Sequence, residues 1–253
     1  MRLQILSDLH LETEDVHPAP APGAELLVLA GDIDATWTGF QRFAGWPVPI
    51  LCVAGNHEYD DRDLATAEPA LRAHLAGLGI RLLERESAVV VAGDGRRVRF
   101  VGCTRWSDFD GLGIAKRDKA LRAGSYFQKI MNATVEGAPF DAPAVRTLAL
   151  ASREWLEHEL ARPGRGEWDR TIVVTHFAPS ARSHDPRYGL QAATASFVNA
   201  DDDLLSRAEL WIHGHLHCRH DWRDGRCRVV SNARGHAKRG EAEGWDGLFA
   251  VDV

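Results

Sequence analysis

The feature of this sequence that most constrains its fold is a set of short apolar runs, each followed at once by polar residues. Runs of this length are too short for helices that bury a whole face, and they suit strands that are covered on both sides. They predict the buried strands of a sheet. The runs are Leu3–Leu6, Leu26–Ala30, Ile50–Ala54, Thr171–Thr175 and Leu210–His213.

Further strands are expected where apolar segments flank a turn signal. Glycine with aspartate or arginine between two such segments is typical of a β-hairpin. The predicted hairpins are Val89–Val91 with Val98–Gly102 and Cys218–Trp222 with Cys227–Ser231, and a last strand is expected at Leu248–Val251.

Two segments have helical periodicity. In Arg62–Leu78 leucines recur mostly by threes and fours, but Pro69 interrupts the pattern, so we expect the helix to start near Glu68 with proline in its first turn. The second helix is predicted over Pro143–Leu160, with Asp141 as its N-terminal cap.

Strands interleaved with helices, together with hairpins, predict an α/β fold with mixed sheets. A chain of 253 residues with 45% hydrophobic and 26% charged side chains suits one large domain, residues 1–253. The glycine-dotted segment Trp106–Pro139 is interpreted as a lid or insertion.

The chemistry is expected at the strand ends. In open α/β sheets, ligands bind beyond the carboxyl ends of the strands, where residues distant in sequence converge. Imidazole and carboxylate groups are metal ligands, and Asp-x-His and His-x-His place both side chains on one side of an extended segment. The candidates are Asp8, His10, Asp32, Asn56, His176, His215 and His217.

Each candidate alone has a structural interpretation. Asp8 or Asp32 could cap a turn, Asn56 could belong to a turn, and His176 could be a hydrogen-bonded core histidine. A purely structural reading of all of them requires a separate coincidence at every strand end. The set therefore predicts a metal centre.

The ordered motifs Asp8-x-His10, Gly31-Asp32, Gly55-Asn56-His57-Glu58, His176 and Gly214-His215-x-His217 resemble the calcineurin-like metallophosphoesterase superfamily. The resemblance spans residues 8 to 217. It implies a four-layer sandwich of two mixed β-sheets flanked by helices. It also implies hydrolysis of phosphate esters by two divalent or trivalent metal ions, with manganese favoured and iron, zinc or nickel as alternatives.

Roles follow from the resemblance by position. A hydroxide shared by the two ions would attack phosphorus, and His57 would contact the phosphate and stabilise or protonate the leaving oxygen. The implied metal ligands are Asp8, His10 and His217 for the first ion, Asn56, His176 and His215 for the second, and Asp32 as the bridge.

The expected substrate class follows from a difference between this sequence and one group of proteins in the superfamily. Protein Ser/Thr phosphatases of the superfamily carry arginine and glycine after the second motif, where this chain reads Ile33–Trp37, and glycine where Leu11 follows His10. We therefore expect phosphodiesters, with small-molecule phosphomonoesters as the alternative. A catalytically silent binding module on the same fold would lack several ligands, and a net charge of -6 argues against a nuclease or another nucleic-acid partner.

Other polar residues near the motifs have weaker signals. Trp106, Arg187 and Tyr188 are candidate substrate contacts. His213 is interpreted as a packing residue or a support for a ligand, and His220 and His236 as surface or supporting groups. Asp34 and Glu58 are expected to orient metal ligands or to stabilise turns.

The expected compartment is the cytoplasm. The four cysteines form no C-x-x-C pair, and no apolar stretch has the length of a signal peptide or a membrane span. The expected partner is a small phosphate ester, without a membrane, and the sequence does not indicate an oligomeric state.

Overall fold

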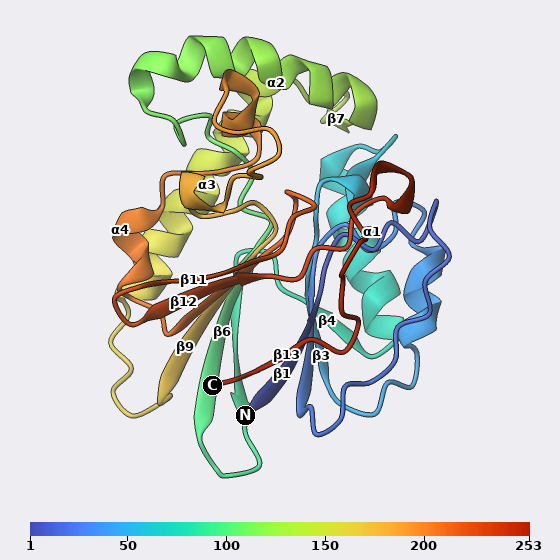
Figure 1. The fold of residues 1–253 in the computed structure, drawn as a ribbon, viewed down its shortest axis with the longest axis vertical. Helices are drawn as coiled ribbons and strands as arrows, with labels where there is room; N and C mark the ends of the chain where they lie inside the picture. Colours follow the sequence, from blue (N-terminus) through green and yellow to red (C-terminus); the bar gives the residue numbers. More distant parts are fainter.

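Two β-sheets pack face to face, with helices on their outer faces (Figure 1). The computed structural model describes residues 1–125 and 128–253 in full and only the backbone at positions 126 and 127. The first sheet has the strand order β13-β1-β2-β3-β4, in which β13 alone runs antiparallel. Its strands are β1 (Arg2–Leu6), β2 (Leu26–Ala30), β3 (Ile50–Val53), β4 (Ile80–Leu82) and β13 (Ala250–Asp252).

The second sheet has the order β11-β12-β10-β9-β6-β5. Its four central strands are parallel, and each edge strand joins through an antiparallel hairpin. Its strands are β5 (Glu86–Val91), β6 (Arg97–Cys103), β9 (Arg170–Thr175), β10 (Leu210–His213), β11 (His220–Asp224) and β12 (Cys227–Ser231). Both predicted hairpins are thus confirmed.

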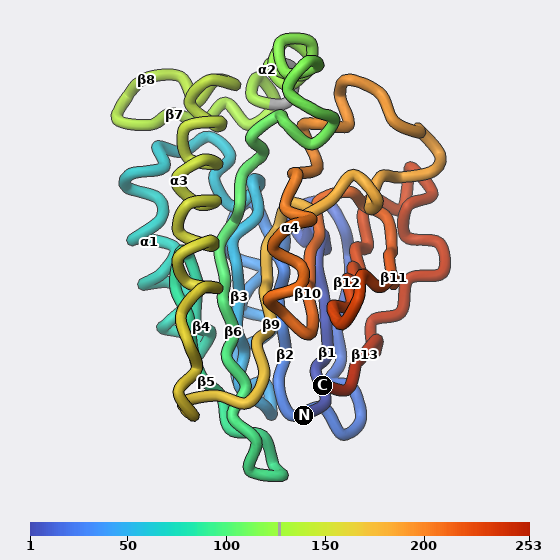
Figure 2. The backbone as a smooth tube through the Cα atoms, turned by 90° about the vertical axis from the view of Figure 1, so that its left-hand side faces the viewer, coloured from blue at the N-terminus to red at the C-terminus, as the bar shows by residue number. Residues whose placement is uncertain are grey.

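Helices form the two outer layers. Helix α1 (Leu64–Gly77) covers the first sheet, while α3 (Ala142–Ala161) and α4 (Asp202–Leu205) lie against the second (Figure 2). Above the sheets lie α2 (Arg117–Met131) and the small hairpin of β7 (Thr134–Val135) and β8 (Ala138–Pro139) (Figure 1). The expected four-layer α/β sandwich is confirmed. None of the described helices is long and apolar enough to cross a membrane.

Strand alternation builds the layers. In β2, Leu26, Val28 and Ala30 pack between the two sheets, whereas Leu27 and Leu29 pack in the core under α1. Successive side chains of a strand point to opposite faces, so a continuous apolar run is what a strand buried on both sides requires. The third core, between the second sheet and α3 with α4, includes Trp211.

Three expectations about elements were wrong or incomplete. Helix α1 begins at Leu64, not near Glu68, because the Asp63 side chain accepts the N–H of Ala65 and caps the helix; Pro69 lies inside it. Strand β11 begins at His220, not Cys218. The segment Trp106–Pro139, interpreted as a lid or insertion, contains the amphipathic helix α2, which was not predicted, and neither was the three-residue β4.

A buried ion pair joins the loops above the second sheet. The guanidinium of Arg105, which is fully buried, donates to both carboxylate oxygens of Asp201 at 3.0 and 2.8 Å. It also donates to Asp108 and to the carbonyl oxygen of Ala149. Arg153 reaches Asp201 from α3 at 2.7 Å. The segment after β6 is therefore tied to α3 and to the segment before α4.

Removing one partner of this pair should destabilise the fold. We expect Asp201→Ala to lower the free energy of unfolding by about 3 kcal/mol, because the buried Arg105 guanidinium loses two hydrogen bonds and keeps Asp108 as its remaining carboxylate partner. The measurement is denaturant unfolding. The control is Asp203→Ala, which removes an exposed partner of Arg153 and should cost under about 1 kcal/mol. Equal effects of the two variants would contradict the argument.

Candidate metal centre

The carboxyl ends of the parallel strands of both sheets meet at one edge of the sandwich. The segments after β1, β2 and β3 carry Asp8 with His10, Asp32, and Asn56, and those after β9 and β10 carry the three remaining histidines. Ligand atoms of Asp8, His10, Asp32 and His217 lie within 4.8 Å of one another, as do those of Asp32, His176 and His215. Asn56 Oδ1 lies 3.2 Å from His176 Nε2. All seven candidates therefore converge, and Asp32 belongs to both groups.

Each of the two central carboxylates has one oxygen that accepts a backbone N–H group and one that does not. Asp8 Oδ1 accepts the backbone N–H of His215 at 2.9 Å, and Asp32 Oδ1 accepts that of His57 at 2.8 Å. Asp8 Oδ2 is buried and accepts no hydrogen bond from the described residues, whereas the buried Asp32 Oδ2 lies 3.1 Å from His176 Nε2. A buried carboxylate oxygen without a partner is costly, and a cation beside it removes that cost.

Three imidazoles are oriented through the nitrogen that faces away from the centre. Nδ1 of His10 donates to Glu12 at 3.0 Å, Nδ1 of His176 to the carbonyl oxygen of Ala30 at 2.9 Å, and Nδ1 of His217 to Glu241 at 2.7 Å. This pattern leaves each Nε2 with its lone pair toward the centre, as in histidines that bind metals.

The free nitrogens point at one another. Nε2 of His10 and Nε2 of His217 are 3.0 Å apart. Two lone pairs at this distance repel unless a proton or a cation lies between them. The donor set of carboxylates, imidazoles and one amide thus fits divalent transition-metal ions.

Several candidates have strained backbones. Asp8, His10, Asp32, His215 and His217 all have positive φ, between 48° and 71°. Residues other than glycine rarely adopt this backbone conformation, and such strain clusters at functional sites. The prediction that Asp-x-His acts through an extended segment was therefore wrong in its reason: Asp8 and His10 meet through left-handed turns. Gly31, at φ +88°, is required by close packing, because a Cβ there would lie 2.3 Å from His176 Nδ1.

Glu58 ties two of these turns together. Its carboxylate is fully buried and accepts backbone N–H groups from Asp32 at 3.0 Å, Ile33 at 2.7 Å, Asp34 at 3.2 Å and Gly55 at 2.6 Å. Burial and the nearby Asp32 raise the pKa of Glu58 to about 7, while the N–H donors act in the opposite direction. Glu58 was expected to orient metal ligands or to stabilise turns, and its single carboxylate is placed to do both. The Asp34 side chain caps a local turn instead, by accepting the N–H of Thr36 and of Gly39.

The centre favours positive charge. Burial opposes protonation of His176, yet Asp32 raises its pKa to about 9. Burial also opposes ionisation of Asp32, but His176 and then His57 hold its pKa well below the usual value. His215, enclosed beside His176, has a pKa well below the usual value because of burial. A cluster that pulls protons onto its imidazoles in this way would equally bind cations.

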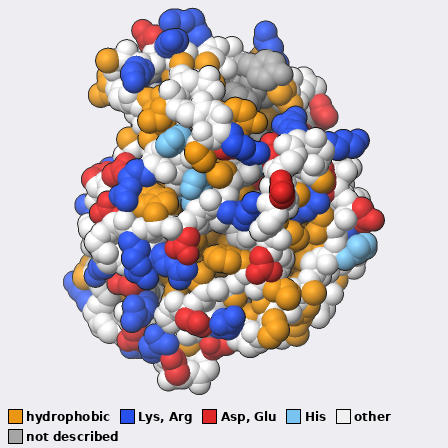
Figure 3. Space-filling model, in the orientation of Figure 1, with side chains coloured by type: hydrophobic (Ala, Val, Ile, Leu, Met, Phe, Trp, Pro, Cys, Tyr) orange, Lys and Arg blue, Asp and Glu red, His pale blue; other side chains and the backbone are white. Residues whose placement is uncertain are grey.

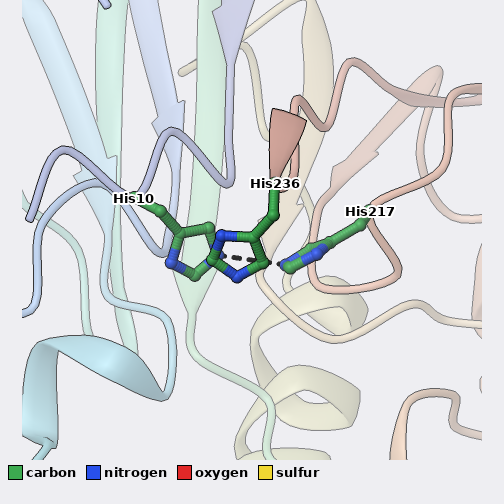
Figure 4. A group of neighbouring side chains, drawn as sticks. All are labelled: His10, His217 and His236. Carbon is green, nitrogen blue, oxygen red and sulfur yellow. Dashed lines mark hydrogen bonds between the residues drawn. The ribbon is translucent and has the colours of Figure 1, made fainter. Parts of the chain in front are cut away.

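His236 joins the centre although its sequence position gave no clear signal. Its ring lies 4.4 Å from that of His10 and 5.2 Å from that of His217, measured between centroids. Figure 4 shows the three imidazoles together, with His236 between the other two in this view. A ring nitrogen of His236 lies within 4.8 Å of ring nitrogens of His10 and His217. The expectation that His236 supports the ligands from nearby agrees with this position.

Other histidines lie away from the centre. His213 is buried, and its Nε2 lies 3.0 Å from the Ser183 hydroxyl, so it packs and does not reach the cluster. Burial lowers the pKa of His213 to about 3, which keeps it neutral. His220 packs against His213, with ring centroids 5.9 Å apart.

A cavity of about 560 Å³ opens from the centre toward α2. Trp106 and Tyr188, two of the candidate substrate contacts, line it, as does His57. Arg187 is not among the lining residues, and its guanidinium pairs with Asp185 at 2.6 Å. Sequence reasoning did not identify Glu12 or Glu241 as partners of ligand histidines. Glu12 stands two residues from His10, a spacing that could have been noticed.

Comparisons with known proteins agree with this geometry. A family model described as calcineurin-like phosphoesterase matches residues 1–219. Among curated proteins, no sequence matches significantly. The fold is similar to that of the phosphopantetheinyl hydrolase PptH from Mycobacterium tuberculosis, with a TM-score of 0.72, 17% identity, and coverage of 96% of this chain and 92% of that one. A dimetal phosphatase from Danio rerio gives a TM-score of 0.50 and 13% identity, covering 91% of this chain and 86% of that one.

The role of Glu58 can be tested by an isosteric change. In Glu58→Gln one of the two accepting oxygens becomes an NH2 group, which cannot accept, so two of the four buried N–H groups lose their acceptor. We expect a loss of at least about 2 kcal/mol in unfolding free energy. We also expect less bound metal per chain, measured by denaturant unfolding and by elemental analysis of protein dialysed against a limiting metal concentration.

The matched control is Glu68→Gln, which changes a half-buried glutamate on α1 outside the centre. It should leave both the stability and the metal content near those of the parent. Full metal content in Glu58→Gln would show that the turns hold their shape without this carboxylate.

Proposed function

The chain belongs to the calcineurin-like phosphoesterase family, whose members hydrolyse phosphoric esters, and on that basis we propose that it hydrolyses phosphodiesters at a centre of two metal ions. The observation that carries the proposal is the sharing of Asp32 between two groups of ligand atoms. One carboxylate with two oxygens suits a pair of cations, which would supply electrostatic stabilisation of both the attacking and the leaving oxygen at phosphorus.

The ligands divide between the two positions as the resemblance implies. Each position then combines imidazole with oxygen donors, which suits manganese, with iron, zinc or nickel as alternatives. The first ion would be held by Asp8, His10 and His217, the second by Asn56, His176 and His215, and both by Asp32.

His57 is the proposed proton donor. Its Nδ1 donates to Asp60 at 2.6 Å, which leaves Nε2 for the cavity that the residue lines. Burial acts against protonation, but Asp32 and then Asp60 raise the pKa of His57 to about 10, so its ring is charged at neutral pH. In the reaction, water forms a new bond to phosphorus and the ester P–O bond breaks. The departing oxygen takes the electron pair of that bond and a proton from Nε2. The attacking water loses one proton to the solvent, and His57 regains a proton from the solvent after the reaction.

A diester is favoured by the charge of the cavity. Among the described lining residues only Arg239 is a lysine or arginine, while Asp32, Asp185 and Glu241 are acidic. A phosphomonoester dianion would have a second negative charge without a matching arginine, whereas a diester carries one. The protein phosphatase motif is also missing after Asp32. Small-molecule monoesters remain the second candidate, because one structural neighbour is a phosphatase.

The expected partner is thus a small phosphate ester. A net charge of -6 and a cavity with one basic residue do not favour a nucleic acid. A silent binding module is disfavoured because the residues of the centre are all in place.

A substrate panel tests the proposal. Bis(p-nitrophenyl) phosphate, p-nitrophenyl phosphate, cyclic nucleotides and a phosphopantetheinyl ester would be assayed with manganese, nickel, zinc and magnesium in parallel. We expect kcat/KM for the diester to exceed that for the monoester by about tenfold or more. The reverse preference would favour the monoester alternative. No turnover, without stoichiometric metal after purification, would favour the silent module.

His57→Ala should slow the reaction and leave the centre intact. Loss of a general acid costs about 100-fold or more in kcat, while the ligand set is unchanged. Rates with bis(p-nitrophenyl) phosphate and metal content by elemental analysis check this prediction. His17→Ala, at an exposed histidine, is the control and should match the parent. An unchanged kcat in His57→Ala would remove His57 from the mechanism.

A further inference from the structure

The cavity extends well beyond the metal centre. A volume of about 560 Å³ is in the range of sites for whole small molecules, and the phosphate group fills only one end. The far end is walled by the segment after β6, by α2, by Val145 of α3 and by the loop after β9. This end of the cavity is called the arm site, and its lining includes Trp106, Phe109, Gln128, Ile130, Tyr188 and Ser196.

Apolar surface begins at a metal ligand and continues outward. The ring of His215 stacks on Phe177, with centroids 4.0 Å apart, and on Phe197, 4.9 Å apart. Phe177 in turn contacts Trp106 at 5.6 Å. A group attached to phosphorus at the centre would therefore meet an aromatic wall as it leaves the centre.

The arm site is uncharged among the described residues. Of the acidic residues that line the cavity, Asp32 belongs to the candidate centre and Glu241 pairs with His217. Asp185 lies beside Tyr188, whose N–H its backbone carbonyl accepts, but its carboxylate pairs with Arg187. An arm that carries a charge would lose its hydration there without gaining a partner. The uncharged wall therefore favours binding of an uncharged group attached to the phosphate.

Two polar atoms in this wall lack partners. Gln128 Oε1 and Ser196 Oγ are buried and make no hydrogen bond to the described residues, and Ser196 is only 7% exposed. Gln128 stands one helical turn after Gly124 on α2. A Cβ at Gly124 would lie 2.3 Å from Phe109 and 3.1 Å from Ser196 Oγ, so glycine lets α2 approach this wall. Unsatisfied buried polar atoms beside a cavity are suited to bind a polar group of a ligand.

The mouth of the cavity is apolar as well. Ile130 and Tyr188 line it and are 54% and 64% exposed. Figure 3 shows hydrophobic side chains next to histidine side chains below the top of the molecule, where Figure 1 places α2.

We infer that the arm site binds one ester arm of the substrate, and that this arm is long, uncharged and mainly apolar, with an amide or hydroxyl group that reaches Gln128 and Ser196. The inference rests on the proposed function and names the substrate class within it.

The test compares arms on one leaving group. Methyl, hexyl and 5-carboxypentyl p-nitrophenyl phosphates share the reacting bond and differ only in the arm. Burial of one methylene is worth about fourfold in affinity, so the hexyl ester should have a KM at least about tenfold lower than the methyl ester. The carboxypentyl ester should lose most of that advantage. Equal KM values for the methyl and hexyl esters would overturn the inference.

A matched pair of variants locates the effect. Ile130→Asp places a charge at the mouth of the arm site, whereas Ile114→Asp makes the same change at an isoleucine that is 71% exposed on the short helix before α2 and does not line the cavity. Ile130→Asp should raise KM for the hexyl ester about tenfold and leave the methyl ester unchanged. Ile114→Asp should change neither, and equal responses of the two variants would overturn the location.

The two polar atoms have their own test. An arm with an internal amide should bind more tightly than its ester isostere, and Ser196→Ala with Gln128→Leu should remove that difference while keeping the hexyl-to-methyl ratio. A difference that survives in the double variant would show that these atoms do not bind the arm.

Failure of the proposed function can be distinguished from failure of the arm site. Calorimetric binding of hexyl methylphosphonate and methyl methylphosphonate to the metal-loaded protein needs no turnover. If no diester is hydrolysed but the hexyl compound binds more tightly, the proposed function is wrong and the arm site stands. Equal affinities would overturn the arm site even in an active enzyme.

Discussion

One buried carboxylate controls the geometry on which the rest of the centre depends. Glu58 accepts backbone N–H groups from two turns, the one that carries Asp32 and the one that carries Asn56. Those turns follow β2 and β3, which are neighbouring parallel strands. The register of the first sheet therefore sets the relative positions of the candidate ligands. Because an unsatisfied buried N–H is costly, the turns have few alternatives to this arrangement.

The centre is built at the expense of local stability. Carboxylates and imidazoles are buried together, Asp8 Oδ2 lacks a hydrogen-bond partner among the described residues, and five of the candidate ligands have left-handed backbones. Such an arrangement persists only where the surrounding structure enforces it, and the apolar layers on both sides of each sheet do so here. Bound cations would relieve the electrostatic part of the strain, which links metal binding to folding.

The cavity depends on a different set of contacts. The pair of Arg105 with Asp201 joins the segment that carries Trp106 and Phe109 to the end of the loop that carries Ser196 and Phe197. The shape of the cavity and the stability of the fold therefore both depend on this network, which lies outside the candidate metal centre.

The apolar runs predicted most of the strands, and the residues after them predicted the candidate ligands, because a parallel sheet brings the residues after successive strands to one edge. The four-layer sandwich was implied by the resemblance of the ordered motifs to a known family. Only the tertiary structure decided which residues support the candidate ligands. Glu241 contacts His217, and His236 contacts His10, although the segment that carries Glu241 and His236 has no periodic sequence pattern. Helix α2 was not predicted although it is amphipathic, and it lines the far end of the cavity and packs against residues 192–196. These contacts depend on packing between distant segments, which no local pattern encodes.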